Sequence, residues 1–394
     1  MSSDERQKKS TGTRLQCIIF FLVVSGILLS SLAPKFVNLV FSLLFDNLDA
    51  PLGKARTLEA YPKARCLDGS AGRYYFRSGS GDGKTKFLIF AEGGGFCTSD
   101  SDCAQRAKTH LGSTMNDPDE MQLSHPFFSQ SKQDNPLLWN WNLVFVRYCD
   151  GAYMSGARVA PVQVKSFWGE GVVHYNGEHI SRAVMADLSK QSGLGSATDV
   201  VFSGCSAGGI HTFAHLDALR DMVPKKAVVV GFPDSGFYLD FPMFRQPKEF
   251  VVAEHGQNAT GLLNKACLAD NPGAEERCLI AAIAAPYLRT AVFAWQSRYD
   301  TDQEKCEMSF WCRWSQDCIR DYGGNLTSEV HRALLANPKN GVFLDSCSRH
   351  CALTNLPRDH TSQKNPTQAF SEWYARNGRI YGQDRTYPCS DCCS

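Results

Sequence analysis

The sequence predicts an α/β fold in which a mostly parallel sheet is covered by helices on both faces. Short apolar runs, each long enough for one buried strand, alternate with segments whose apolar residues recur at helical spacing. Such alternation is typical of parallel sheets, whose strands are buried on both sides. The 394 residues carry 21% charged side chains and a formal net charge of +1, which gives no electrostatic basis for nucleic-acid binding.

Strands are expected where apolar runs are rich in β-branched and aromatic residues: 86–91, 143–146, 199–203, 227–230, 291–294 and 341–344. Helical spacing predicts helices over 179–188 and 210–222. In such sheets, chemistry gathers at the carboxyl ends of the strands. The residues that directly follow each predicted strand are therefore the first candidates for a functional site.

The most informative segment is Gly204-Cys205-Ser206-Ala207-Gly208, which lies between a predicted strand and a predicted helix. G-x-S-x-G in this context is the pattern of a nucleophile elbow, a sharp turn that lifts the serine hydroxyl above the sheet edge. The turn requires small residues around the serine, and Gly204, Ala207, Gly208 and Gly209 meet that requirement. A glycine-rich turn that merely contains serine is the alternative. The sequence predicts Ser206 as the nucleophile.

The first strand ends in Glu92-Gly-Gly-Gly-Phe-Cys97. Consecutive glycines let a backbone approach a ligand closely and present N–H groups to it. In hydrolases of this architecture one oxyanion-hole donor comes from such a loop and the other from the residue after the serine. We therefore expect the backbone N–H groups of Gly94 and Ala207 to bind the oxyanion. A phosphate-binding loop is the alternative, but no G-K-[ST] follows the glycines.

The catalytic acid is expected after Ser206, because this fold arranges its triad in the order serine, acid, histidine. Asp300 follows the strand 291–294 and is favoured over Asp234, one strand earlier, which would instead organise the substrate pocket. Asp302 is a further candidate. Asp150 precedes the serine and does not fit the order.

The histidine is expected at position 350, in the segment that follows the last predicted strand. Cys347 and Cys351 flank it, and bridging cysteines would hold the imidazole in register. The other histidines considered are interpreted as packed residues behind the nucleophile or as polar surface: His211, His215 and His360. With Asp300 orienting His350 and His350 activating Ser206, the predicted chemistry is acyl transfer from an ester, and it requires no metal or organic cofactor.

The N-terminus predicts a membrane anchor. Residues 15–33 are almost wholly apolar and about long enough to cross a bilayer, and basic residues precede them. The alternative is a signal peptide cleaved after Ala33, but Pro34 disfavours that cleavage. Either interpretation directs the chain to the secretory pathway. The expected organisation is a cytosolic tail, a signal anchor, a stem and a luminal domain: 1–14, 15–33, 34–59 and 60–394.

The 16 cysteines favour disulfides in an oxidising compartment over zinc, because no pair of C-x-x-C units has the spacing of a zinc ribbon. Cys97 and Cys103 are expected to pair, and Cys149 to anchor a loop beside the pocket. If Cys17 lies in the membrane, at least one other cysteine is unpaired, and Cys205 is the candidate. Asn258 and Asn325 lie in glycosylation sequons, which agrees with a luminal domain.

Taken together, the motifs resemble those of the pectin acetylesterases, within the pectinacetylesterase and Notum group of serine carboxylesterases. The segments that carry the resemblance are 66–70, 92–97, 147–152, 203–209, 299–303, 345–351 and 387–389. The resemblance implies an α/β-hydrolase-like fold with an added lid and removal of acetyl esters from galacturonan. It places the triad on Ser206, Asp300 and His350, and the oxyanion loop on 93–95.

Two departures from the family pattern stand out. Phe96 occupies a position where the family usually has tryptophan, and the uncleaved-looking anchor points to a Golgi or membrane-held enzyme. The expected partner is an acetylated polysaccharide, and the expected state is a monomer. Two alternatives stay open: a Notum-type deacylase that removes a fatty acyl group from a protein, and a membrane-tethered glycan-binding protein on an inactive hydrolase scaffold.

Overall fold

A computed structural model describes residues 52–123, 125–166, 169–307, 311–351, 366–376 and 381–383. All of them belong to one compact unit, residues 51–394. The expected tail, the anchor at 15–33 and most of the stem lie outside the described residues. Within the described ranges, no helix combines the length and apolarity needed to cross a membrane. The strand Leu52–Thr57 pairs with a neighbour, so the sheet begins before the domain start expected at residue 60.

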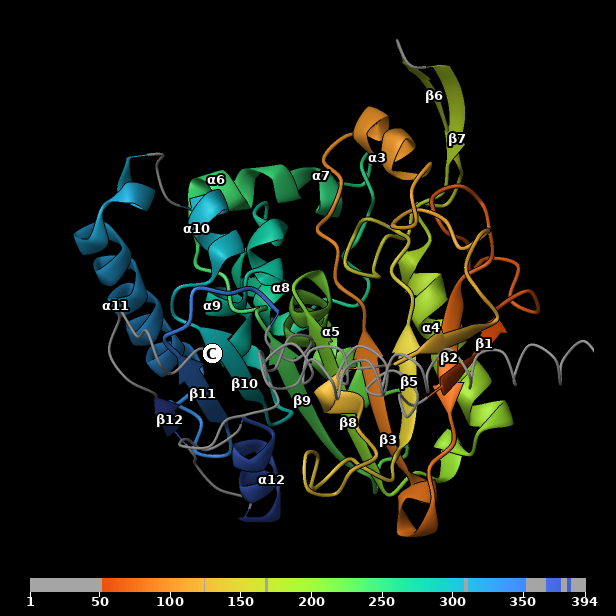
Figure 1. The fold of residues 1–394 in the computed structure, drawn as a ribbon. Helices are drawn as coiled ribbons and strands as arrows, with labels where there is room; N and C mark the ends of the chain where they lie inside the picture. Colours follow the sequence, from red (N-terminus) through yellow and green to blue (C-terminus); the bar gives the residue numbers. More distant parts are fainter. Residues whose placement is uncertain are drawn as a thin grey trace, which may run out of the picture. The chain divides into compact units, whose positions relative to one another are not determined.

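Among the described residues, the main sheet has ten strands in the order β12-β11-β10-β9-β8-β3-β5-β2-β1-β4 (Figure 1). Their bounds are β1 Leu52–Thr57, β2 Arg73–Arg77, β3 Lys86–Ala91, β4 Glu120–Gln122, β5 Asn142–Val146, β8 Asp199–Cys205, β9 Val228–Asp234, β10 Phe293–Ser297, β11 Gly341–Asp345 and β12 Tyr381–Gln383. The strands from β12 to β5 pair in parallel, whereas β2, β1 and β4 extend the sheet antiparallel. A separate hairpin consists of β6 Val162–Ser166 and β7 Gly169–Val173.

Every strand predicted from the sequence is present, as β3, β5, β8, β9, β10 and β11. They form one continuous parallel block because their residues are buried on both faces. The strands β1, β2, β4 and β12 were not predicted. β1 alternates charged and small residues, so it resembles a polar loop until a neighbouring strand pairs with it.

Helices cover both faces of the sheet, as predicted. The predicted helices are confirmed as α4 Gly177–Gln191 and α5 Ala207–Arg220, and their apolar residues pack on the face that carries Ile89 and Phe202. On the opposite face, α12 Pro366–Arg376 packs against residues such as Phe90 and Phe232. The rings of Phe232 and Phe370 stack with centroids 4.2 Å apart. Successive side chains of each strand point to opposite faces of the sheet, so each strand contributes to two separate apolar layers.

Insertions gather at the end of the sheet where the parallel strands finish (Figure 1). The remaining α-helices of the described residues are α3 Asp100–Arg106, α6 Pro242–Arg245, α7 Glu249–Val252, α8 Lys265–Asp270, α9 Ala281–Ala284, α10 Thr301–Glu307 and α11 Gln316–Ala333. The 3-10 helices are η1 Gly81–Thr85, η2 Pro126–Phe128, η3 Leu194–Ser196, η4 Gln246–Lys248, η5 Glu275–Leu279, η6 Ala285–Tyr287 and η7 Cys312–Trp314. In Figure 1, α3, α6, α7 and α10 lie at this end, and η1 lies at the other. The resemblance implied an added lid, and α3, α6, α7 and α10 lie at the end of the sheet where such a lid is expected (Figure 1).

Disulfides link segments around this end of the sheet. The described pairs are Cys66–Cys149, Cys97–Cys103, Cys205–Cys351 and Cys267–Cys278. The predicted Cys97–Cys103 bridge and the disulfide at Cys149 are confirmed. The expectation that Cys205 is unpaired was wrong: as the last residue of β8, it lies where the histidine loop crosses the strand ends, and it bonds there to Cys351. Cys205 is tightly packed at the elbow and still forms a disulfide with Cys351.

Candidate active site

Ser206 occupies the turn between β8 and α5, with φ 58° and ψ −120°. A residue with a side chain is strained in this positive-φ region, and nucleophile elbows use the strain to expose the serine. The Ser206 N–H donates to the Asp234 carbonyl at 3.1 Å, which fastens the turn to β9. The predicted strand, turn and helix are therefore present around Ser206.

The need for small residues around the elbow is visible in the packing. A Cβ atom on Gly204 would lie 2.6 Å from the Ala91 carbonyl oxygen, and one on Gly209 would lie 2.5 Å from the Asp234 carbonyl oxygen. Both distances are too short for a side chain. The glycines thus allow α5 to start directly against β3 and β9.

Asp300 and His350 meet at the carboxyl ends of β10 and β11. The Nδ1 atom of His350 lies 2.8 Å from each carboxylate oxygen of Asp300, whose side chain is fully buried. The backbone N–H groups of Asp302 and Gln303 donate to Asp300 Oδ1 at 2.9 and 3.1 Å and fix the carboxylate. A carboxylate that accepts the Nδ1 proton leaves Nε2 of the imidazole available as a base.

A disulfide holds the histidine loop beside the elbow. Cys205 directly precedes Ser206, Cys351 directly follows His350, and their sulfurs are bonded. A ring nitrogen of His350 lies within 4.8 Å of both sulfur atoms. Among the described residues, the Ser206 hydroxyl makes no hydrogen bond to His350. Such catalytic hydrogen bonds are commonly long without substrate and tighten when it binds.

The environment of His350 favours its protonated form. Burial lowers the pKa of the imidazole, but the hydrogen bond and charge of Asp300, with the charges of Asp302 and Asp234, outweigh burial and raise the pKa above its usual value. The carboxylates therefore stabilise the imidazolium that forms when a histidine removes a proton from serine.

The other carboxylates considered from the sequence have different positions. Asp234 ends β9, is fully buried, and accepts the Ser235 hydroxyl at 2.9 Å. Asp302 accepts the Tyr238 hydroxyl at 3.0 Å. Asp150 accepts backbone N–H groups of the segment that follows it, including that of Met154 at 3.0 Å. Asp234 thus supports the elbow through its backbone, and Asp150 organises its own loop.

Two of the rival histidines are buried and contact each other. His211 and His215 are buried along α5, where the His211 Nδ1 atom lies 2.8 Å from the Tyr153 carbonyl oxygen. Burial lowers the pKa of His211 to about 4, so this side chain is neutral near pH 7. His360 lies outside the described residues.

The glycine loop lies beside the nucleophile. A Cβ atom on Gly93 would be 3.1 Å from the Ser206 Cβ atom, and Gly94 and Gly95 have φ values of 146° and 67°. Glycine adopts these positive values at little cost. The backbone of the loop therefore lies close to the serine. That the N–H groups of Gly94 and Ala207 bind the oxyanion stays a prediction.

Residues that directly follow β5 form hydrogen bonds to this glycine loop. The Tyr148 hydroxyl donates to the Gly95 carbonyl at 2.6 Å, and the Tyr148 N–H donates to the Glu92 carboxylate at 2.8 Å. Glu92 also pairs with Arg147, whose Nε atom contacts Asp117 at 2.7 Å. Both ends of the glycine run are thereby fixed by side chains of the neighbouring strand.

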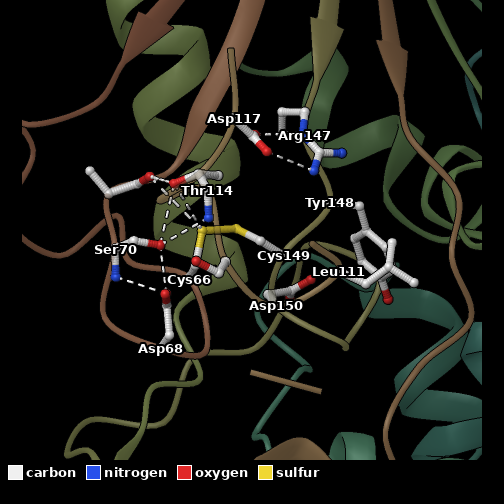
Figure 2. The surroundings of a disulfide bond; sticks show 12 residues. Cys66, Asp68, Ser70, Leu111, Thr114, Asp117, Arg147, Tyr148, Cys149 and Asp150 are labelled. Carbon is white, nitrogen blue, oxygen red and sulfur yellow. Dashed lines mark hydrogen bonds and ion pairs between the residues drawn. A yellow bond between two sulfur atoms is a disulfide. The ribbon is translucent and has the colours of Figure 1, made fainter. Parts of the chain in front are cut away.

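Figure 2 shows that the Cys66–Cys149 disulfide joins the segment after β5, which contains Arg147 and Tyr148, to the segment around Cys66. On the Cys66 side, Ser70 donates to Asp68, and the Thr114 N–H donates to the Ser70 hydroxyl at 3.1 Å. On the Cys149 side, Arg147 faces Asp117. Sequence reasoning missed Asp117 and Thr114, because nothing in their local sequence indicates that Asp117 pairs with Arg147 or that Thr114 contacts Ser70.

Phe96 contributes an aromatic wall next to the glycine loop. Its ring centroid lies 5.4 Å from that of Tyr153 and 4.5 Å from the ammonium nitrogen of Lys248, a fully buried lysine in η4. Lys248 also donates to the Phe244 carbonyl at 2.8 Å. No sequence motif distinguishes Lys248, so its contact with Phe96 is visible only in the fold.

The fold, the strained serine elbow and the Asp–His pair define a carboxylic ester hydrolase. A model of the family described as pectinacetylesterase matches residues 54–394, and the chain belongs to that family. It is 30% identical to pectin acetylesterase 4 of Arabidopsis thaliana over 361 residues, which is 84% of this chain and 85% of the relative.

The similarity extends to the deacylase branch. The chain is 26% identical to the palmitoleoyl-protein carboxylesterase NOTUM of Schmidtea mediterranea, covering 81% of this chain and 62% of that protein. A solved structure of the Wnt deacylase Notum from Drosophila superposes with a TM-score of 0.71 at 25% identity, covering 87% of this chain and 99% of that one. These neighbours agree with the predicted mostly parallel sheet flanked by helices.

Proposed function

We propose that this protein is a serine acetylesterase that removes acetyl groups from pectin or a related acetylated cell-wall polysaccharide. Its family and its identity to the plant pectin acetylesterase support an acetyl ester as substrate. The observation that carries the mechanism is the His350–Asp300 pair, in which the loop of His350 is bonded through Cys351 to Cys205, the residue before Ser206.

In the proposed reaction, His350 removes the Ser206 proton while the serine oxygen attacks the acetyl carbonyl. The backbone N–H groups of Gly94 and Ala207 stabilise the tetrahedral oxyanion, and loss of one such donor typically costs about 3 kcal/mol of transition-state stabilisation. His350 then protonates the leaving sugar hydroxyl, which leaves an acetyl-serine. Water, activated by the same imidazole, releases acetate and regenerates the enzyme.

The test is acetate release from a panel of acetylated pectins and xylans. The wild type is expected to release acetate, and Ser206→Ala to release none above background. Retained activity in Ser206→Ala would contradict the proposal. A folded wild type that hydrolyses no ester and reacts with no fluorophosphonate probe would favour the inactive, glycan-binding alternative.

A Notum-type deacylase is the second candidate, favoured by the superposition on the Wnt deacylase from Drosophila. Acetyl and long-chain esters require the same triad, and only the depth of the acyl pocket separates them. Comparing hydrolysis of p-nitrophenyl acetate with that of the octanoate ester tests the choice. A strong preference for the acetate supports the acetylesterase, and a strong preference for the octanoate supports the deacylase.

We also propose that the enzyme works in the secretory pathway or outside the cell, held by the apolar segment 15–33. The segment's length, its preceding basic residues and the disulfides of the described domain support this. Carbonate extraction of membranes tests the anchor, because a retained anchor keeps the protein in the pellet. Release of the full-length chain into the supernatant would contradict it.

A further inference from the structure

We propose that the Cys205–Cys351 disulfide is a positioning element for catalysis, which fixes the proton-accepting ring of His350 relative to the Ser206 hydroxyl. The proposal rests on the function proposed above. It assigns a role in the reaction to two residues outside the proposed triad and oxyanion hole, and it departs from the sequence-based expectation that Cys205 is unpaired.

The position of the bond in the chain is its first support. Its two cysteines are separated by 146 residues, yet each is the immediate neighbour of a proposed catalytic residue. The Cα atoms of Cys205 and Cys351 lie 5.5 Å apart. The cross-link therefore limits how far the backbones of Ser206 and His350 can separate, more directly than any contact further along either loop.

The elbow side of the link is rigid. Cys205 is the last residue of β8, is 2% exposed, and pairs with Asp234 in the register of β9. A Cβ atom on Gly93 would lie 2.5 Å from the Cys205 carbonyl oxygen, so the glycine loop packs closely against it. The Cys205 half of the disulfide is therefore held in a fixed position by the sheet.

The histidine side depends on the link. The base of the loop is held by Asp345, which accepts the Cys347 N–H at 2.9 Å and pairs with Arg349. At the far end, Cys351 has φ 63°, a strained value for a residue with a side chain. Cys351 is bonded to Cys205, donates its N–H to Ser235 Oγ at 3.0 Å, and packs against the apolar layer that contains Phe232. Strained backbone persists only where the surroundings determine it. The link, as the one covalent restraint among these contacts, therefore helps to fix the direction in which the His350 side chain projects from the loop.

A general base must be placed accurately, and a misplacement of about 1 Å costs about 100-fold in rate. Cutting the link should therefore lower kcat about 100-fold while KM for a small ester changes little, because the cut displaces the base and removes no group assigned to ester binding. A disulfide that only stabilised the fold would lower Tm and leave kcat of the folded enzyme unchanged.

The test compares two double variants. Cys205→Ala with Cys351→Ala removes the link, and Cys267→Ala with Cys278→Ala removes another buried disulfide that adjoins no proposed catalytic residue. We would measure kcat and KM for p-nitrophenyl acetate, the rate of Ser206 phosphonylation by a fluorophosphonate, and Tm. The kinetic measurements would be made at a temperature below the unfolding transitions of both variants. In the first variant, kcat and the phosphonylation rate are expected to fall. In the second variant, only Tm is expected to fall. Equal kcat in the first variant and the wild type would overturn the proposal.

A second experiment covers the case in which the first variant does not fold. Limited treatment of folded wild type with a trialkylphosphine breaks the sulfur–sulfur bond. The phosphine supplies two electrons, water supplies the oxygen of the phosphine oxide, and two thiols form. Alkylation and peptide mapping then report which disulfides have opened. Activity should fall in proportion to alkylation of Cys351, and full activity with that bond open would overturn the proposal.

The outcomes also separate this proposal from the function on which it rests. A wild type that neither hydrolyses the ester nor reacts with the probe would refute the proposed function, and the role of the disulfide would fall with it. An active wild type with an equally active link-free variant would refute only the role of the disulfide.

Discussion

The Nδ1 atom of His350 lies 2.8 Å from both carboxylate oxygens of Asp300, across 50 residues of sequence. This pair joins the ends of β10 and β11, which are adjacent parallel strands in register. The carboxylate selects the tautomer in which Nε2 carries no proton and is ready to accept one.

Asp300→Asn should therefore lower kcat about 10,000-fold, because an amide in this position favours the wrong imidazole tautomer. The matched control is Asp302→Asn, which removes a nearby carboxylate that contacts Tyr238 instead of His350. Hydrolysis of p-nitrophenyl acetate measures both variants. A larger loss in Asp302→Asn than in Asp300→Asn would show that the acid has been assigned to the wrong residue.

The pH dependence of kcat/KM should report the pKa of His350. The ring must be neutral to accept a proton, so activity falls as the pH drops through this pKa, which Asp300, Asp302 and Asp234 raise above its usual value of about 6.5 despite burial. The acidic limb should therefore have its midpoint above pH 6.5. Asp302→Asn removes one negative charge, which should lower the pKa and move the limb to lower pH. A shift to higher pH would contradict this electrostatic account.

Gly94→Ala should reduce kcat by about 100- to 1,000-fold, the usual effect of losing one oxyanion donor. The residue has φ 146°, and the added Cβ atom would lie 2.6 Å from a Leu111 methyl carbon, so the loop must shift. Gly171→Ala, on the β6–β7 hairpin with open space around it, is the control and should behave like the wild type. If Gly94→Ala keeps the wild-type kcat, the Gly94 N–H is not an oxyanion donor.

The buried histidines of α5 should make the protein sensitive to acid. Burial depresses the pKa of His211 to about 4, so the unfolded chain binds a proton more readily than the folded one as the pH falls below about 6.5. Stability is thus lost between pH 6.5 and about 4, by about 2 to 3 kcal/mol for this group. Urea unfolding at pH 7 and 4.5 should show a smaller difference for His211→Asn than for wild type. His331→Asn, at an exposed position on α11, should keep the full difference.

The sequence predicted the parts of the fold whose determinants are local. Each central strand is a short run buried on both faces, and the order of serine, acid and histidine along the chain selected Asp300 and His350, which the structure pairs. The antiparallel edge could not be predicted in this way, because β1 and β4 become strands only through pairing. The Cys205–Cys351 bond and the Lys248–Phe96 contact join segments far apart in sequence, and spacing carries no information about such pairs.

The most direct test of the central claim is mass spectrometry of the covalent adduct. Folded protein is treated with a fluorophosphonate, digested and mapped, alongside His350→Ala and Ser206→Ala. The account predicts one phosphonyl group on the wild-type peptide that contains Ser206, much slower labelling in His350→Ala, and none at that peptide in Ser206→Ala. An ester-hydrolysing wild type that is labelled elsewhere, or that is labelled equally fast without His350, would contradict it.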